Sequence, residues 1–235
     1  MSRIAIMQPY LFPYIGYFQL MAAADTFVLY DNIQYTKKGW INRNRILVNG
    51  KDEYISVPLK KDSDFLDVRD RFLADEWSLE KKHVLNKIRE GYKKAPSFGH
   101  AFPVIERCIN FEEKNLFKYI SNSLALLKDY LGINTPFIIS SSLDIDHKLK
   151  AEKKVISICK CVQASAYLNP IGGTELYNKE QFKKEGIELN FIKTNNFEYP
   201  QFNNVFIPFL SIIDVMMFNS SEKIREYINS QYSII

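Results

Sequence analysis

The chain has 235 residues, 46% of them hydrophobic and 25% charged, which is typical of a globular protein with a substantial core. It has no apolar run of 18 residues and no leader-like apolar stretch at its start, so we expect a cytoplasmic protein without a membrane span. The three cysteines lack the spacing of a zinc site, which predicts reduced thiols and no bound metal.

The net charge of +4 is concentrated in one stretch of the chain. No acid occurs between Asp31 and Asp52, while five cations do: Lys37, Lys38, Arg43, Arg45 and Lys51. One short basic cluster and a mild pI of 8.7 do not indicate a nucleic-acid partner. They favour a small anionic ligand such as a phosphate.

The first thirty residues predict a strand, a helix and a second strand, at residues 4–7, 16–24 and 26–30. Such a unit makes its two strands parallel, so both end at the same edge of the sheet. A hairpin follows at about residues 45–58, because Asn49-Gly50 separates two runs with strand character. Helices are then predicted at residues 76–94, at 102–109 starting near Pro103, and at 112–131.

The second half alternates between strands and helices. Strands are predicted at residues 136–140, 166–168 and 187–193, and helices at 150–161, 178–185, 210–218 and 222–231. This order predicts one α/β domain over residues 1–235 with a mostly parallel, Rossmann-like sheet. The hairpin is an insertion into it, and residues 76–131 form a helical block.

Aromatic and polar side chains follow the first predicted strand in a loop broken by Pro9, Pro13 and Gly16. Open α/β sheets bind ligands at this position. We therefore predict substrate-binding roles for Gln8, Tyr10, Tyr14 and Tyr17. The alternative is a hydrophobic plug beneath a loop.

Two further stretches are candidates for the same site. In the basic stretch, arginine forks suit phosphate and a tryptophan suits a ring, which predicts binding roles for Lys37, Lys38, Trp40, Arg43, Asn44 and Arg45. After the strand at 166–168, a glycine-rich turn predicts anion binding by Asn169, Gly172 and Gly173. The alternatives are a solvated edge strand and a turn needed for packing. Asp214, inside an apolar run, requires a buried partner, and we expect its role to be structural.

These stretches resemble the WbqC-like family nearly from end to end. The motifs are Met7-Gln8-Pro9-Tyr10, Phe12-Pro13-Tyr14-Ile15-Gly16-Tyr17-Phe18, Tyr30-Asp31-Asn32, Lys38-Gly39-Trp40-Ile41-Asn42-Arg43-Asn44-Arg45, Asn169-Pro170-Ile171-Gly172-Gly173 and Leu210-Ser211-Ile212-Ile213-Asp214. The resemblance implies a role in bacterial O-antigen and surface-polysaccharide synthesis, with glycyl or related acyl transfer to a sugar amine.

A fainter resemblance is to nucleotidylyltransferases, whose His-x-Gly-His loop corresponds here to Tyr14-Ile15-Gly16-Tyr17. Both histidines are absent, and tyrosine cannot supply a cation to a transferring phosphoryl group. Nucleotide binding is therefore compatible with the sequence, whereas adenylyl transfer by that route is not expected.

The leading hypothesis is an acyl or aminoacyl transferase that acts on a nucleotide-linked amino sugar, with an acyl thioester of CoA or of an acyl carrier protein as donor. Asp31 would orient or deprotonate the acceptor amine, and the amides of Gly172 and Gly173 would stabilise the oxyanion. One alternative is a nucleotide-binding, ATP-dependent ligase. Another is a non-catalytic partner in a polysaccharide assembly complex.

Overall fold

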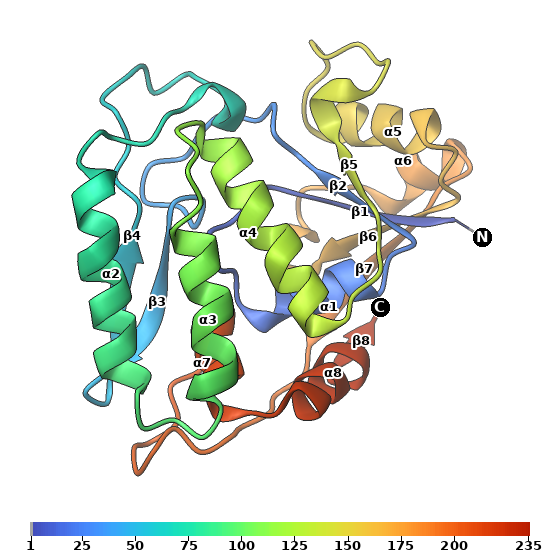
Figure 1. The fold of residues 1–235 in the computed structure, drawn as a ribbon. Coiled ribbons are helices and arrows are strands. Elements are labelled where there is room, and N and C mark those ends of the chain that lie inside the picture. The colour runs from blue at the N-terminus through green and yellow to red at the C-terminus, as the bar shows by residue number, and fades with distance from the viewer. Residues whose placement is uncertain (1) are drawn as a thin grey trace.

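The computed structural model describes residues 2–235 and contains a six-stranded sheet with the order β5-β2-β1-β6-β7-β8 (Figure 1). The strands β1 (Arg3–Met7), β2 (Thr26–Leu29), β5 (Phe137–Ile139), β6 (Ala166–Pro170) and β7 (Glu188–Thr194) are parallel, and β8 (Tyr232–Ile234) pairs antiparallel with β7. The prediction of an α/β fold with a mostly parallel sheet is confirmed.

Helices cover both faces of this sheet (Figure 1). In β1, Ile4 and Ile6 pack with residues of α5 (Ala151–Cys161) and α6 (Lys179–Lys184), while Ala5 packs on the opposite side. That second side is covered by α1 (Ile15–Ala22), α4 (Leu116–Leu131) and α8 (Ser221–Ser230). Because both faces are buried at the centre of the sheet, Ile4–Ile6 of β1 and Phe27–Leu29 of β2 form apolar runs without polar alternation.

The strand order contains a switch point at β1. The chain adds β2 and β5 on one side of β1 and then returns to add β6 and β7 on the other side. In open parallel sheets, ligands bind beyond the carboxyl ends of the strands near such a point. The loops that follow β1, β2 and β6 therefore occupy the positions where a ligand is expected.

The predicted hairpin and helical block are both present, and the hairpin lies with the first two helices of the block at the opposite end of the molecule from α5 and α6 (Figure 1). Strands β3 (Arg43–Val48) and β4 (Lys51–Ser56) are joined by Asn49 and Gly50, whose φ angles of 50° and 75° are the left-handed values that this turn requires. Helices α2 (Trp77–Tyr92) and α3 (Phe98–Ile109) follow, and α2 packs on β3. The short helix α7 (Ile212–Phe218), which precedes α8 in the chain, is buried against α3 and β3.

Two elements differ from the prediction. Helix α3 begins at Phe98 rather than near Pro103, because Ser97 is anchored to the carbonyl groups of Met217 and Asn219. Pro103 is accommodated inside the helix. Strand β8 was not predicted, because three residues carry no periodic signal and their conformation depends on pairing with β7.

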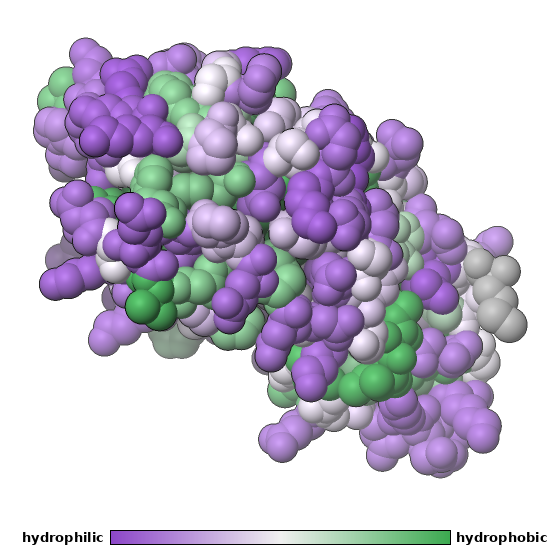
Figure 2. All heavy atoms as spheres, turned by 90° about the horizontal axis from the view of Figure 1, so that it is seen from below, coloured by the Kyte–Doolittle hydropathy of each residue, from purple (hydrophilic) through white to green (hydrophobic). Residues whose placement is uncertain are grey.

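Figure 2 shows the molecule from below the view of Figure 1, and this face mixes apolar side chains with polar and charged ones. No helix within residues 2–235 combines the length and apolarity that crossing a membrane requires.

Candidate functional site

Two of the three predicted stretches converge beside the hairpin. Tyr10 and Tyr14, which follow β1, line a cavity of about 200 Å³ together with Trp40, Asn44 and Arg45 from the basic stretch. Pro13 and Phe209 complete its wall. We call this space the hairpin cavity. It brings together ring faces, an amide and a guanidinium, which are groups that bind polar ligands containing rings.

Arginines and aromatic rings alternate along the outer surface of the hairpin. Arg43 lies 4.7 Å from the centre of the Tyr54 ring, and Trp40 stacks on that ring at 6.3 Å with an interplanar angle of 23°. Arg45 in turn lies 5.7 Å from the Trp40 ring. The alternation in β3 places both arginines on one face, as predicted. Trp40 remains 39% exposed, so part of its ring surface is accessible to a ligand.

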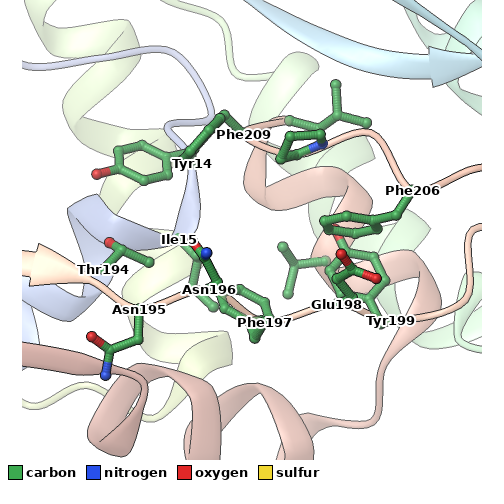
Figure 3. A pocket seen from close by; sticks show the side chains of 13 residues that line it. Tyr14, Ile15, Thr194, Asn195, Asn196, Phe197, Glu198, Tyr199, Phe206 and Phe209 are labelled. Atoms are coloured by element: carbon green, nitrogen blue, oxygen red, sulfur yellow. The ribbon is translucent and has the colours of Figure 1, made fainter.

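A second cavity adjoins the first across the rings of Tyr14 and Phe209, which line both (Figure 3). These two rings meet edge to face at 6.3 Å. The second cavity, of about 340 Å³, is lined mainly by the end of β7 and the segment that follows it, together with Ile15 and Val215. The lining residues of that part of the chain are Thr194, Asn195, Asn196, Phe197, Glu198, Tyr199, Phe206, Pro208, Phe209 and Leu210. We call it the loop cavity, and the two together the aromatic site. Among residues 2–235, Glu198 and Arg45 are the charged residues that line it.

Asp214 holds the wall of the loop cavity in place. Its carboxylate accepts hydrogen bonds from Tyr92 Oη at 2.8 Å, Tyr199 Oη at 2.7 Å and Gln201 Nε2 at 2.7 Å. Burial raises its pKa, and these three donors act in the opposite direction. Tyr199 lines the cavity. Gln201 also closes the loop, because its Nε2 donates to the carbonyl oxygen of Ile207 and its Oε1 accepts from the Ile207 backbone N–H. The predicted structural role of Asp214 therefore consists of bracing two tyrosines and a loop.

Asn44, Tyr17 and Gln8 shape the loop after β1. Asn44 Nδ2 donates to the carbonyl oxygens of Leu11 at 3.1 Å and Phe12 at 2.9 Å, and so ties this loop to the hairpin. Tyr17 is buried and donates to the carbonyl of Gln8 at 3.0 Å. Their geometry supports Tyr10 and Tyr14 from behind, and the binding roles predicted for them stay predictions.

The basic stretch is less cationic in three dimensions than in the sequence. Lys37 pairs with Asp64 at 2.8 Å, and Arg45 pairs with Asp52 at 2.9 Å. Both acids lie outside the acid-free stretch and are brought to it by folding. Arg43 Nη2 donates a hydrogen bond to the backbone carbonyl of Lys38. Neither the Lys38 nor the Arg43 side chain lines the aromatic site. Arg45 is therefore the cation of this cluster that faces the cavities.

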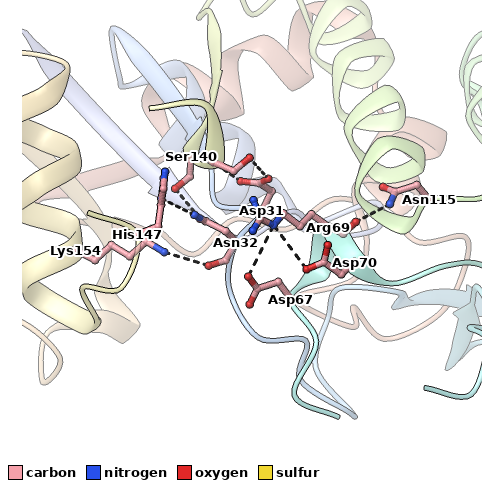
Figure 4. Close-up of polar contacts among 10 residues, drawn as sticks. Asp31, Asn32, Asp67, Arg69, Asp70, Asn115, Ser140, His147 and Lys154 are labelled. Atoms are coloured by element: carbon pink, nitrogen blue, oxygen red, sulfur yellow. Dashed lines mark hydrogen bonds and ion pairs between the residues drawn. The ribbon is translucent and has the colours of Figure 1, made fainter. Parts of the chain in front are cut away.

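Asp31 lies at the end of β2 in a different polar cluster (Figure 4). It is only 2% exposed, and its two carboxylate oxygens accept hydrogen bonds from Ser141 N at 2.9 Å and Ser141 Oγ at 2.6 Å. It thereby holds the short 3₁₀ turn Ser140–Ser142 against β2. Both roles predicted for Asp31, orienting or deprotonating an acceptor amine, stay predictions.

The third predicted stretch does not share the aromatic site. Among residues 2–235, those that line the two cavities do not include Asn169, Gly172 or Gly173. Asn169 accepts a hydrogen bond from Tyr167 Oη at 2.9 Å, and a Cβ on Gly173 would lie 1.8 Å from Asn169 Nδ2. The close approach of this amide requires a glycine at 173. Anion binding by this turn stays a prediction.

The model of the WbqC-like protein family matches residues 8–226. The chain belongs to the WbqC-like protein family. It is 27% identical over 231 residues to the uncharacterized protein Rv1507c of Mycobacterium tuberculosis, an alignment that covers 97% of this chain and 98% of that protein. No solved structure matches the chain at a significant level.

Sequence reasoning missed several residues of this WbqC-like chain that line its cavities. Glu198 and Phe209 were not singled out, although Phe209 is 66% exposed and follows Pro208 in an otherwise irregular segment. The signal was the length of the segment between β7 and α7, which forms a long loop beside the predicted site. Lys154 and His147 were also missed as parts of a pocket. Residues 2–235 contain no cluster of three His, Cys, Asp or Glu side chains placed to hold a metal ion.

Proposed function

We propose that this chain is an N-acyl or aminoacyl transferase that acts on a nucleotide-linked amino sugar in bacterial surface-polysaccharide synthesis. The aromatic site carries the proposal, because it combines exposed rings with one carboxylate, Glu198, and one guanidinium, Arg45. Its two cavities, of about 340 and 200 Å³, together have the size of a site for a small organic molecule. Membership of the WbqC-like family agrees with this assignment.

The ring faces suit the sugar and the base of the substrate. Trp40 and Tyr14 are each more than one-third exposed and present flat apolar surface to the cavities. Arg45 suits a phosphate or carboxylate group, because a guanidinium donates two parallel hydrogen bonds to either. Its partner Asp52 is 42% exposed at the side chain, so this ion pair is weak enough to be exchanged for a ligand.

The proposed reaction needs no covalent enzyme intermediate. The sugar amine attacks the carbonyl carbon of an acyl thioester, a C–N bond forms, the C–S bond breaks, and the thiol leaves. The amine loses one proton to Glu198, the carboxylate that lines the loop cavity, and Glu198 passes this proton to the departing thiolate sulfur, which leaves as the thiol. Asp31 takes the role of a positioning residue in this scheme, because both of its carboxylate oxygens already bind Ser141.

The test is a turnover assay with UDP-linked amino sugars and acyl-CoA donors, with products identified by mass spectrometry. Glu198→Gln keeps the shape of the side chain and removes its basicity, so we expect turnover to fall roughly 100-fold while sugar-nucleotide binding is retained. Glu226→Gln, an exposed carboxylate of α8 paired with Lys223, is the matched control and is expected to behave like the unmodified protein.

Other outcomes would replace the proposal. Consumption of ATP with release of pyrophosphate, in the absence of a thioester, would favour the ligase. Failure of every sugar nucleotide to bind, together with specific capture of another polysaccharide-synthesis protein, would favour the non-catalytic partner. Equal turnover of Glu198→Gln and the unmodified chain would remove Glu198 from the mechanism.

A further inference from the structure

A further pocket, of about 520 Å³ and separate from the two cavities of the aromatic site, lies beyond the carboxyl end of β2 and beside the start of α5. Its lining contains four cations, Arg69, Lys148, Lys150 and Lys154, against one carboxylate, Asp67. The remaining lining residues include the rings of Tyr30, Phe65 and Tyr177. We call it the cationic pocket. It shares no lining residue with the aromatic site.

Lys154 is the unusual residue of this pocket, because it is a buried cation. It is only 4% exposed, and among residues 2–235 no carboxylate lies within ion-pair distance of its Nζ atom. Within residues 2–235, its one hydrogen-bond acceptor is the carbonyl oxygen of Asn32 at 3.3 Å (Figure 4). The Tyr30 ring lies 5.1 Å from the Nζ atom. An ammonium has three N–H donors, so most of its hydrogen-bonding capacity is unused.

Burying such a charge is costly unless something compensates it. Burial lowers the pKa of Lys154, and the carboxylates of Asp67 and Asp31 offset this in part from a longer range. A chain that needed only to fill this space would be more stable with an apolar side chain. The position of Lys154 on the pocket wall indicates that the compensating anion is a ligand.

The wall around Lys154 is held rigidly by Asn32. Its Oδ1 accepts from Ser140 Oγ at 2.9 Å, so its Nδ2 is the donor to His147 Nδ1 at 2.9 Å. His147 Nε2 then donates to the carbonyl of Leu143 at 3.1 Å. This chain of hydrogen bonds connects β2 to the segment that carries Lys148 and Lys150, and it orders the site before a ligand arrives.

The other cations of the pocket retain capacity for a ligand. Arg69 Nε lies 3.9 Å from Asp67 and 3.7 Å from Asp70, which are long contacts at an exposed position. Within residues 2–235, Lys148 and Lys150 form no ion pair. Lys150 and Ala151 line the pocket at the start of α5, where the helix dipole adds to the positive potential.

We propose that the cationic pocket binds the phosphoryl group of a small phosphorylated molecule, with Lys154 as its central ligand and Arg69 and Lys150 at the rim. The rings of Tyr30 and Tyr177 contact the organic part of that molecule. This site is distinct from the aromatic site, and the proposal holds whether or not the transferase assignment is correct.

The experiment is isothermal titration of the full chain with inorganic pyrophosphate, followed by UDP as a probe that adds a ring. Lys154→Met keeps an unbranched side chain that is one atom shorter and removes its charge, and Lys150→Glu reverses a charge at an exposed rim position. Lys160→Met, on the outside of the same helix and paired with Glu185, is the matched control. Melting temperatures of the ligand-free proteins are measured in parallel.

We expect saturable, one-to-one binding of pyrophosphate that weakens about tenfold or more in Lys154→Met and Lys150→Glu and changes less than twofold in Lys160→Met. The melting temperature of Lys154→Met is expected to equal or exceed that of the unmodified chain, because an uncompensated buried charge is removed. The proposal is overturned if pyrophosphate and UDP both fail to bind at millimolar concentration, or if Lys154→Met binds as well as the unmodified chain. It is also overturned if Lys154→Met loses stability and binding together while Lys150→Glu binds normally.

Discussion

The aromatic site and the cationic pocket occupy different regions of the same sheet edge, and they are built in opposite ways. The aromatic site presents large, partly exposed rings from two short stretches of sequence and one long loop. The cationic pocket is assembled from four separate segments, and its central residue is buried. Sites made of consecutive unusual residues can be recognised in a sequence, whereas sites made of common residues from distant segments cannot.

The polar networks behind the two regions also differ. Asp214 is a buried carboxyl group with three donors, so the cost of burying it is offset in part within the protein. Lys154 is a buried cation with one carbonyl acceptor among residues 2–235, so its charge is left largely uncompensated. The first network contributes stability to the wall of the loop cavity. The second retains capacity for a ligand at the expense of stability.

The largest effect is expected from Asp214→Ala. Truncation leaves the hydroxyl groups of Tyr92 and Tyr199 and the amide of Gln201 without their acceptor in a buried space, and opens a cavity. We expect the free energy of unfolding to fall by about 3–5 kcal/mol in chemical denaturation. A loss below about 1 kcal/mol would show that the Asp214 network is no more important to stability than an exposed contact.

Asp214→Asn is the control, since it keeps one acceptor oxygen and the volume. Burial raises the pKa of Asp214 in the folded chain, so its contribution to stability is fully present below the unfolded pKa and declines as pH rises through the folded value. The unmodified chain should therefore gain stability relative to Asp214→Asn as pH is lowered from neutral. A difference between them that does not vary with pH would contradict the raised pKa.

Trp40→Ala is expected to have an intermediate effect, confined to the aromatic site. Loss of the exposed ring should weaken binding of a UDP-linked amino sugar about tenfold, as measured by titration, because stacking surface is removed. The free energy of unfolding should change little, since Trp40 is 39% exposed. Phe72→Ala, a 44% exposed ring that lines neither region, is the matched control. Equal weakening by both variants would mean that Trp40 is not part of a specific site.

The smallest effect is expected from Asp31→Asn. Its amide oxygen can still accept from Ser141 N, and its amide group can donate to Ser141 Oγ, so the 3₁₀ turn should keep its position. Turnover should therefore fall less than about tenfold, in contrast to the larger loss expected of a general base. A fall of roughly 100-fold or more, with sugar-nucleotide binding unchanged, would return Asp31 to the role of base.

Local patterns predicted most of the fold. The apolar runs of β1 and β2, the Asn49-Gly50 turn and Gly132 at the end of α4 each have a conformational preference that the structure retains. Predictions failed where long-range contacts outweighed local preference. Helix α3 begins five residues before Pro103, at Phe98, because Ser97 is anchored to residues at the end of α7. Strand β8 exists only through its pairing with β7.

The candidate site was predictable in part. Trp40 and Arg45 line the same cavity as Tyr10 and Tyr14, although their binding roles stay predictions. Strand alternation accounts for the shared face of Arg43 and Arg45 in β3, whereas Trp40 precedes that strand and is brought to the cavity by folding. The free positive charge of the basic stretch was overestimated, because Asp64 from a later segment pairs with Lys37, and Asp52 at the border of the stretch pairs with Arg45 across the hairpin. Glu198 carried no local signal, since a single acid in a loop resembles any other solvated carboxylate.

The sequence by itself determined the family, the parallel sheet, the hairpin and the set of aromatic residues beside the first strand, since these follow from short-range periodicity and contiguous motifs. Only the tertiary structure decided which cations keep their charge available, which acids are buried in hydrogen bonds, and that Lys154 has no carboxylate partner among residues 2–235. The physical reason is that compensation of a charge depends on groups brought within a few ångströms by folding, and their distance along the chain does not reveal it.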